Sequence, residues 1–191
     1  MKVVAFNGSA RKKGNTEALI RHLLSELEQE GIETERVSLA GKPMKGCTAC
    51  QKCFENKNGR CSVDDDFLNT CLEKMTAADG IIIGSPTYFA DVSTETKALI
   101  DRCGYVAKAN GEIFRRKVGA AVVAVRRAGS IHAFDTINHF FTISQMIIPG
   151  SSYWNMGIGL DRGDVEGDEE GIATMKTLGQ NMAWLLKKLA A

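Results

Sequence analysis

Short apolar runs alternate along this chain with longer amphipathic segments, and this alternation limits the folds that the chain can adopt. The apolar runs that we interpret as buried strands are residues 2–7, 80–84, 117–125 and 146–149, and residues 34–39, in which Val37 and Leu39 are apolar, are interpreted as a further strand. Short apolar runs of this kind are typical of strands covered on both faces. Strands that alternate with helices predict a parallel sheet whose right-handed crossovers place helices on both faces. The expected fold class is therefore α/β, arranged as a three-layer sandwich.

The segments between these runs carry apolar residues at helical spacing. The expected helices are residues 16–30, 64–78, 94–103, 130–145 and 168–189. The acidic run at 64–66 is interpreted as the cap and dipole complement of the second helix. Cys71 and Cys103 lie on apolar helix faces, so we expect both to be core residues.

The composition is typical of one globular domain covering residues 1–191. The chain has 24 Lys and Arg against 23 Asp and Glu, which gives a formal net charge of +1, and 44% of its residues are hydrophobic. These values exclude a disordered chain and give no global electrostatic reason to bind nucleic acid or an anionic membrane. No apolar run approaches the roughly 18–20 residues of a membrane helix, and the first residues resemble a strand rather than a leader. We expect a cytoplasmic protein whose cysteines stay reduced.

Polar side chains follow the first apolar run, at the strand end where ligands of open α/β sheets bind. Ser9, Arg11, Asn15 and Thr16 offer hydrogen-bond donors, and the helix that follows offers free N–H groups. This combination predicts a site for one phosphate group. Neither the Walker ending nor the Gly-x-Gly-x-x-Gly fingerprint is present. The alternative is a polar connection in which Thr16 caps the helix.

Two further loops follow the third and fourth apolar runs. Residues 85–93 contain a proline that fixes a turn and two aromatic side chains, and residues 126–130 place two arginines and a glycine before a helix. The first loop can flank a heteroaromatic ring, and the second can meet an anion or an electron-rich ring edge. The alternatives are a structural turn with its aromatic side chains in the core, and ordinary surface arginines.

Four of the six cysteines lie in a segment, residues 42–64, that breaks the helix and strand patterns, which we call the cysteine loop. They follow the spacing Cys47-x2-Cys50-x2-Cys53-x7-Cys61. Clustered thiolates suit a [4Fe–4S] cluster or Zn²⁺, and the spacing is similar to the ferredoxin run with a longer last gap. Structural zinc more often uses two separated Cys-x2-Cys pairs. The residues themselves leave open a cluster, zinc, a redox dithiol or no ligand role.

The loops together resemble the flavodoxin-like NAD(P)H-dependent FMN reductase family. Gly-Ser-x-Arg-x-x-Gly-Asn-Thr at residues 8–16 and Ser-Pro-Thr-Tyr-Phe at residues 85–89 carry this resemblance. The cysteine loop after the second strand narrows it to the iron–sulfur flavoproteins. The resemblance implies a flavodoxin-like five-stranded parallel sheet in the order 2-1-3-4-5.

The resemblance also implies FMN as the cofactor, a [4Fe–4S] cluster, and NAD(P)H as a reductant. The residues expected to bind FMN come from all three loops: Ser9, Arg11, Asn15, Thr16, Pro86, Thr87, Tyr88, Phe89, Asp91, Arg126, Arg127, Ala128 and Gly129. The residues expected to ligate the cluster are Cys47, Cys50, Cys53 and Cys61.

These expectations describe an FMN-dependent oxidoreductase or electron-transfer flavoprotein. Electrons would pass between FMN and the cluster, to or from a ferredoxin-like protein or a small-molecule acceptor, with no side-chain acid, base or nucleophile. Surplus apolar residues over 134–148 favour a subunit interface, and the resemblance implies a homodimer or homotetramer. The alternatives are a cluster-free NAD(P)H-dependent FMN or quinone reductase and, from another class, a zinc-bearing redox sensor or binding module.

Overall fold

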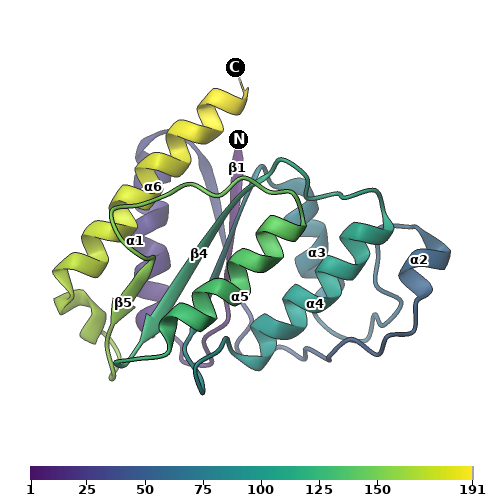
Figure 1. Ribbon diagram of the computed structural model, residues 1–191, viewed down its shortest axis with the longest axis horizontal. Helices are drawn as coiled ribbons and strands as arrows, with labels where there is room; N and C mark the ends of the chain where they lie inside the picture. The colour runs from purple at the N-terminus through teal and green to yellow at the C-terminus, as the bar shows by residue number, and fades with distance from the viewer. Residues whose placement is uncertain (191) are drawn as a thin grey trace.

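A computed structural model describes residues 1–190 as a five-stranded sheet between two helical layers (Figure 1). The strands are β1 (Lys2–Asn7), β2 (Glu33–Ser38), β3 (Gly80–Pro86), β4 (Val118–Val125) and β5 (Met156–Ile158). The helices are α1 (Asn15–Gln29), α2 (Lys52–Asn56), α3 (Leu68–Ala77), α4 (Thr94–Ala109), α5 (Ser130–Ile143) and α6 (Glu169–Ala190), with a 3-10 helix η1 (Asp164–Gly167). All neighbouring strands pair in parallel, in the order β2-β1-β3-β4-β5. The expected fold class and strand order are confirmed.

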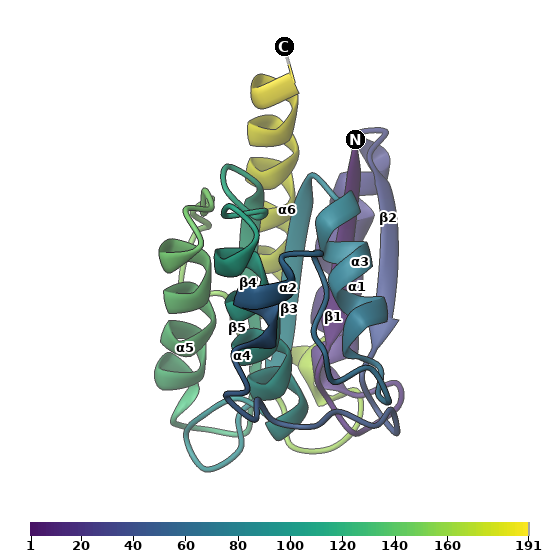
Figure 2. The ribbon, with the colours of Figure 1, turned by 90° about the vertical axis from the view of Figure 1, so that its right-hand side faces the viewer.

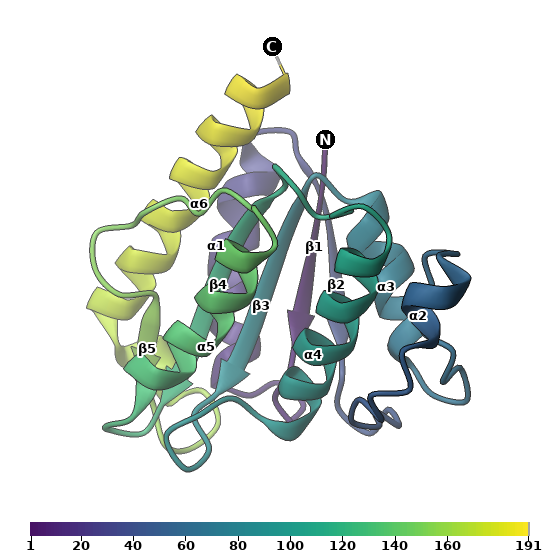
Figure 3. The same ribbon diagram turned by 45° about the vertical axis from the view of Figure 1, so that its right-hand side comes forward.

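The two faces of the sheet are covered by different helices (Figures 2 and 3). Helices α1 and α6 cover the face into which Val3 and Ala5 point. Helices α3, α4 and α5 cover the other face, which receives Val4 and Phe6. Because successive strand residues point to opposite faces, β1 contributes to both cores and has no exposed apolar side. The short helix α2 lies at the side of the molecule, next to α4 (Figure 3).

Two strand glycines let α1 lie close to the sheet. A Cβ on Gly84 would lie 2.6 Å from Ile20 Cδ1, and a Cβ on Gly157 would lie 2.6 Å from Leu19 Cδ2. Both distances are shorter than real Cβ contacts, so a larger residue at either position would displace an α1 side chain from the sheet. The close approach places the first turn of α1 beside the carboxyl ends of the central strands.

The prediction of the fifth strand at residues 146–149 is wrong. The fifth strand is β5, and Ile147 makes a single parallel bridge to Val118. Two segments pair with the outer edge of β4. Ile147 pairs near the beginning of β4, and β5 pairs with Val123–Val125 near its end. The apolar run at 146–149 indicated burial correctly for Met146 but not sustained pairing.

Three helices also differ from expectation. Helix α4 continues to Ala109, α3 begins at Leu68 rather than at residue 64, and α2 was not predicted. Helix α3 begins late because Asp66 accepts a hydrogen bond from the Leu68 N–H (3.1 Å) and thereby ends the acidic turn before it. Cys71 and Cys103 are fully buried, as predicted. Within residues 1–190, no helix combines the length and apolar character that a membrane crossing requires.

Candidate functional site

A pocket of about 190 Å³ lies at the carboxyl ends of the strands, and we call it the strand-end pocket. It draws residues from the loops after β1 and β3, from the end of β4, and from the segment after β5. Its lining consists of Ser9, Arg11, Asn15, Thr16, Pro86, Thr87, Tyr88, Ala124, Val125, Arg126, Gly159 and Leu160. The structure therefore brings together the four residues predicted to bind phosphate, three of those predicted to flank a ring, and Arg126 of the loop after β4.

The phosphate end of the pocket is the beginning of α1. Gly14, not Thr16, is the N-cap, and the Ala18 N–H is the first to bond within the helix, to the Gly14 carbonyl (3.1 Å). The earlier N–H groups of the first turn have no intrahelical acceptor and carry the positive end of the helix dipole. Ser9 orders the loop before them, because its Oγ accepts the Arg11 N–H (3.2 Å).

A fourth wall of the pocket, the segment 159–165 from which Gly159 and Leu160 line the pocket, was missed by the sequence analysis. Asn15 Nδ2 donates to the Asp161 carbonyl (2.9 Å), and Asn15 Oδ1 accepts the Gly163 N–H (3.0 Å). Arg11 Nη1 donates to the Leu160 carbonyl (2.7 Å). The side-chain amide of Asn15 therefore fastens this wall. Gly159 was the available signal of close packing in the sequence, since a Cβ there would lie 2.6 Å from Asn15 Nδ2.

The ring end of the pocket is a tight turn after β3. Tyr88 and Asp91 exchange two backbone hydrogen bonds (2.8 and 3.0 Å), and Phe89 and Ala90 between them both have left-handed φ angles of 49° and 64°. A turn with two such residues normally uses Asn or Gly, so this turn is strained. Thr87 Oγ1 is buried without a hydrogen-bond partner among residues 1–190, and Thr87 lines the pocket. An unpaired buried hydroxyl fits a polar ligand edge at this position.

Five predicted residues lie outside the lining of this pocket, namely Phe89, Asp91, Arg127, Ala128 and Gly129. Phe89 is fully exposed at the tip of the turn. Gly129 is the left-handed N-cap of α5, and a Cβ there would lie 3.0 Å from Ala90 Cα.

Asp91 fastens the turn to α5. One carboxylate oxygen of Asp91 accepts the Val92 N–H (2.7 Å) and the Thr136 hydroxyl (2.8 Å). Burial alone would raise the pKa of Asp91, but these hydrogen bonds and nearby His132 outweigh it and hold that pKa below its ordinary value.

A second site, the cysteine cavity, is formed by the cysteine loop against α4. It measures about 20 Å³, roughly the space of one water molecule. It is lined by Cys47, Thr48, Ala49, Cys50, Gln51, Cys53, Cys61, Ser62, Val63, Arg102, Tyr105 and Val106. All four predicted ligands thus meet at one cavity, and none is in a disulfide. Within residues 1–190, no group of three or more His, Cys, Asp or Glu side chains is placed to hold a single metal ion.

The cysteines of this cavity differ in their surroundings. Cys50 is exposed, and hydrogen bonds from the Ser62 hydroxyl, the Lys52 backbone N–H and the Thr48 hydroxyl lower its pKa to about 7. Cys53 is half-buried, and burial raises its pKa. A donor set of four free thiols fits thiophilic metals and iron–sulfur clusters, whose irons are held by thiolates.

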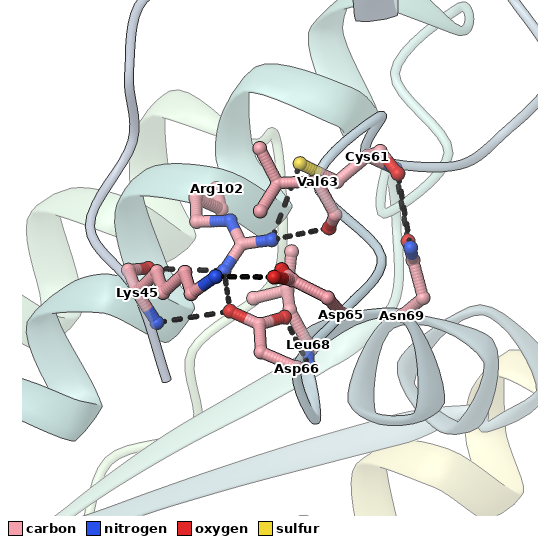
Figure 4. A network of polar contacts seen from close by, with 8 residues as sticks. All are labelled: Lys45, Cys61, Val63, Asp65, Asp66, Leu68, Asn69 and Arg102. Carbon is pink, nitrogen blue, oxygen red and sulfur yellow. Dashed lines mark hydrogen bonds and ion pairs between the residues drawn. The ribbon is translucent and has the colours of Figure 1, made fainter. Parts of the chain in front are cut away.

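A buried arginine joins the cysteine loop to α4 (Figure 4). Arg102 donates to the Lys45 carbonyl (3.0 Å), to the Val63 carbonyl (2.7 Å) and to Cys61 Sγ (3.4 Å), and forms an ion pair with Asp66. The side chains of Arg102 and Asp66 are 1% and 0% exposed. Burial alone would raise the pKa of Asp66, but Arg102 and two backbone N–H groups hold it below its ordinary value. The sequence analysis missed both residues.

The backbone of the last cysteine is anchored separately (Figure 4). The Cys61 N–H donates to Asn69 Oδ1 (2.9 Å), and Asn69 Nδ2 donates to the Cys61 carbonyl (2.9 Å). At the C-cap of α4, Asn110 Oδ1 accepts the Gly59 N–H (2.8 Å). Side chains from α3 and α4 therefore fix the second half of the loop.

Known proteins resemble this chain over most of its length. An iron-sulfur flavoprotein of Methanocaldococcus jannaschii is 40% identical, with 98% of each chain covered. An iron-sulfur flavoprotein of Methanosarcina thermophila is 31% identical over 98% of this chain and 96% of its own. Among solved structures, RosB with a bound riboflavin-5'-phosphate derivative has a TM-score of 0.82 at 20% identity, covering 100% of this chain and 80% of its own.

A flavodoxin from the domain Archaea has a TM-score of 0.63 at 18% identity, with 98% of this chain and 99% of its own covered. At these identities the two structures show the fold, which is flavodoxin-like. The sequence profile of one family matches residues 1–161, which include every residue that lines the strand-end pocket and the whole cysteine loop. The chain belongs to the NADPH-dependent FMN reductase family, the FMN-binding, flavodoxin-like oxidoreductases.

Proposed function

We propose that this protein is an FMN-dependent oxidoreductase that passes electrons between FMN in the strand-end pocket and a [4Fe–4S] cluster in the cysteine cavity. The observation that carries the proposal is that four free thiols line one cavity in a chain of an FMN reductase family. The relatives named iron-sulfur flavoproteins support the same assignment.

The strand-end pocket suits FMN in both its polar and its flat parts. Ser9, Arg11 and the free N–H groups at the beginning of α1 would hold the phosphate. Thr87 would hydrogen-bond the ring edge, and Pro86 and Tyr88 would contact the flat ring. The pocket volume is below the roughly 300–1,000 Å³ of a complete ligand site, so the ring would lie partly over the exposed rim near Tyr88.

Bound FMN supplies two-electron uptake and one-electron release, which matches a two-electron donor to a one-electron cluster. NAD(P)H or a reduced ferredoxin-like protein would be the donor, and a redox protein or a small molecule the acceptor. The protein's own groups bind and orient the two centres. No side chain of either site has to transfer a proton.

We propose a cytoplasmic homodimer or homotetramer. Exposed apolar side chains are clustered on α5 and the segment that follows it, including Ile131, Ile143, Tyr153 and Trp154. Trp154 packs against Phe134 of α5 with ring centroids 6.2 Å apart, so the segment after α5 lies against this helix at that point. Apolar patches of this kind are typical of subunit interfaces.

The second candidate is a cluster-free NAD(P)H-dependent FMN or quinone reductase, which the family match alone would support. It predicts full turnover with NAD(P)H after Cys50→Ser. A zinc-bearing redox sensor or binding module is the third candidate, and it predicts zinc without flavin or NAD(P)H oxidation.

The decisive experiment is anaerobic purification followed by assays of iron, sulfide, zinc and FMN per chain. About four irons and one FMN, with broad visible absorbance that bleaches on reduction, would support the two-centre carrier. FMN without iron, even after anaerobic reconstitution with iron and sulfide, would overturn the cluster and leave the reductase. Zinc with no flavin would overturn both.

A further inference from the structure

We propose that Arg102 is a positioning residue of the cysteine cavity, whose guanidinium closes the cysteine loop and directs an N–H at Cys61 Sγ, thereby raising the cluster's reduction potential. The inference rests on the proposed function, because it requires a cluster on the four cysteines. Arg102 belongs to α4 and lies more than 40 positions after Cys61, the last cysteine of the cysteine loop.

The guanidinium joins the two ends of the loop symmetrically. One terminal nitrogen bonds the Lys45 carbonyl, two residues before the first cysteine, and the other bonds the Val63 carbonyl, two residues after the last. Asp66 adds a further link between the loop and α4, because it pairs with Arg102 and also accepts the Lys45 N–H (2.9 Å). The planar, rigid fork of arginine can reach these acceptors together, whereas the single ammonium of lysine cannot.

The same guanidinium presents positive charge to the sulfur. Figure 4 shows Asp66 on one side of Arg102 and the Cys61 sulfur on the other. The Arg102–Sγ distance is 3.4 Å, and the arginine is buried, so water screens the interaction little. Arg102 Nε is also buried without a partner among residues 1–190, although the residue lines the cavity, so a second donor is unused.

Hydrogen bonds to the sulfurs help to set the reduction potential of an iron–sulfur centre. Reduction of the cluster by one electron, for example from dithionite, adds one negative charge to the cluster and its thiolates and no proton. A buried N–H donor at one ligand stabilises this added charge. Removal of the donor is therefore expected to make the cluster harder to reduce.

The test is a redox titration of the reconstituted protein, followed by visible and electron paramagnetic resonance spectra. Arg102→Gln should lower the ratio of reduced to oxidised cluster at a fixed potential about tenfold, which is about 59 mV for one electron. Asp66→Asn should shift the cluster in the opposite direction, because it removes the countercharge. The FMN midpoint should not change in either variant.

Arg60→Gln is the matched control, since Arg60 precedes Cys61 but pairs with Glu73 at the surface. It should leave the cluster potential unchanged. If Arg102→Gln fails to hold iron, Arg102→Lys replaces it and should also give a lowered potential.

A wild-type cluster potential in a fully loaded Arg102 variant would overturn the inference, as would shifts in the same direction for Arg102→Gln and Asp66→Asn. Loss of iron from both Arg102 variants, with wild-type FMN content and melting, would limit Arg102 to cluster retention and overturn its effect on potential. Iron-free wild-type protein, by contrast, would refute the proposed function before Arg102 is tested.

Discussion

The two sites of this molecule are built in opposite ways. The strand-end pocket gathers residues from Ser9 to Leu160, and its position follows from where buried parallel strands end. The cysteine cavity is lined mainly by residues 47–63, and α2 within that segment buries none of its residues. The comparison teaches that the sheet core fixes the first site, whereas a few polar contacts to α3 and α4 hold the second.

The backbone of the cysteine loop shows the same contrast. Ala49, Gln51 and Lys57 all have left-handed φ angles, of 52°, 59° and 45°. Each such conformation costs free energy in a residue other than glycine. The cysteine loop therefore depends on its contacts with α3 and α4. A substitution in one site should change that site and leave the other unaffected.

The largest difference between the two sites, in iron content against FMN content, is expected from Cys50→Ser. This exposed thiol has no packing role, so its replacement should abolish stable iron binding while FMN content per chain stays at the wild-type level. Metal and flavin analysis of the reconstituted variant measures both. Cys103→Ala is the control, because Cys103 is buried in the core and should leave the iron content unchanged. Loss of flavin from Cys50→Ser would show that the sites are not independent.

Asp66→Asn should lower the free energy of unfolding of the iron-free protein by about 3 kcal/mol. The substitution breaks a buried ion pair and leaves Arg102 uncompensated, which typically costs about 3–5 kcal/mol. Urea denaturation at pH 7 measures the difference. Asp65→Asn is the control, because Asp65 pairs with Lys45 at the surface, where solvent screens the pair, and should leave the free energy of unfolding close to the wild-type value. Equal costs for the two variants would contradict a special role for the buried pair.

The stabilisation by Asp66 should depend on pH. The pKa of Asp66 is lower in the folded protein than its ordinary value of 3.8, so folding favours the charged form. Its contribution is therefore fully present above about pH 5 and is lost as the pH falls below 3.8 toward the lowered pKa. Urea denaturation from pH 6 to pH 3 should show the wild-type advantage over Asp66→Asn shrinking across this range. An advantage that grows with acidity would reverse the sign and contradict the assignment.

Arg11→Ala should weaken FMN binding about tenfold and leave the iron content unchanged. A hydrogen bond to a charged group contributes about 1.5–3 kcal/mol, and the variant also releases the Leu160 carbonyl that Arg11 holds. Titration of flavin fluorescence measures the dissociation constant. Lys12→Ala, an exposed neighbour outside the pocket, should bind FMN as the wild type does.

The smallest expected effect concerns Cys50 in the iron-free protein. Its pKa of about 7 predicts that alkylation by iodoacetamide reaches half its maximal rate near pH 7. Ser62→Ala removes the largest cause of the lowered pKa and should move this midpoint upward, toward the ordinary value of 9.0. Peptide mass spectrometry after timed labelling gives the rate at Cys50. An unchanged midpoint in Ser62→Ala would remove Ser62 from the account.

The sequence predicted what depends on local patterns. Strands β1, β3 and β4 follow from apolar runs and β2 from the predicted segment 34–39, and the polar residues at the strand ends lie together in one pocket. The fifth strand was misplaced because Met156–Ile158 is short and contains a glycine, whereas the apolar run at 146–149 makes one bridge. Apolar character predicts burial better than it predicts strand pairing.

Polar contacts between residues far apart in the chain could not be predicted from the sequence. Asp66 stands in a run of three aspartates, and no pattern distinguishes the buried one from its exposed neighbours. Arg102 lies 36 residues later, in a helix whose spacing indicates only a buried face. The wall at residues 159–165 was hidden in the same way, because its partners are Arg11 and Asn15 at the other end of the chain.

The contacts that hold the cysteine loop against α4 also determine whether this segment could be transferred to another protein. All four cysteines and most of their supports lie within residues 45–69, but Arg102 of α4 and Asn110 at the C-cap of α4 do not. A graft of this segment onto a flavodoxin-like chain without cysteines would therefore transfer the thiols and leave the loop open. A graft that keeps the loop in place has to include Arg102 of α4 and Asn110 at the C-cap of α4 along with the segment.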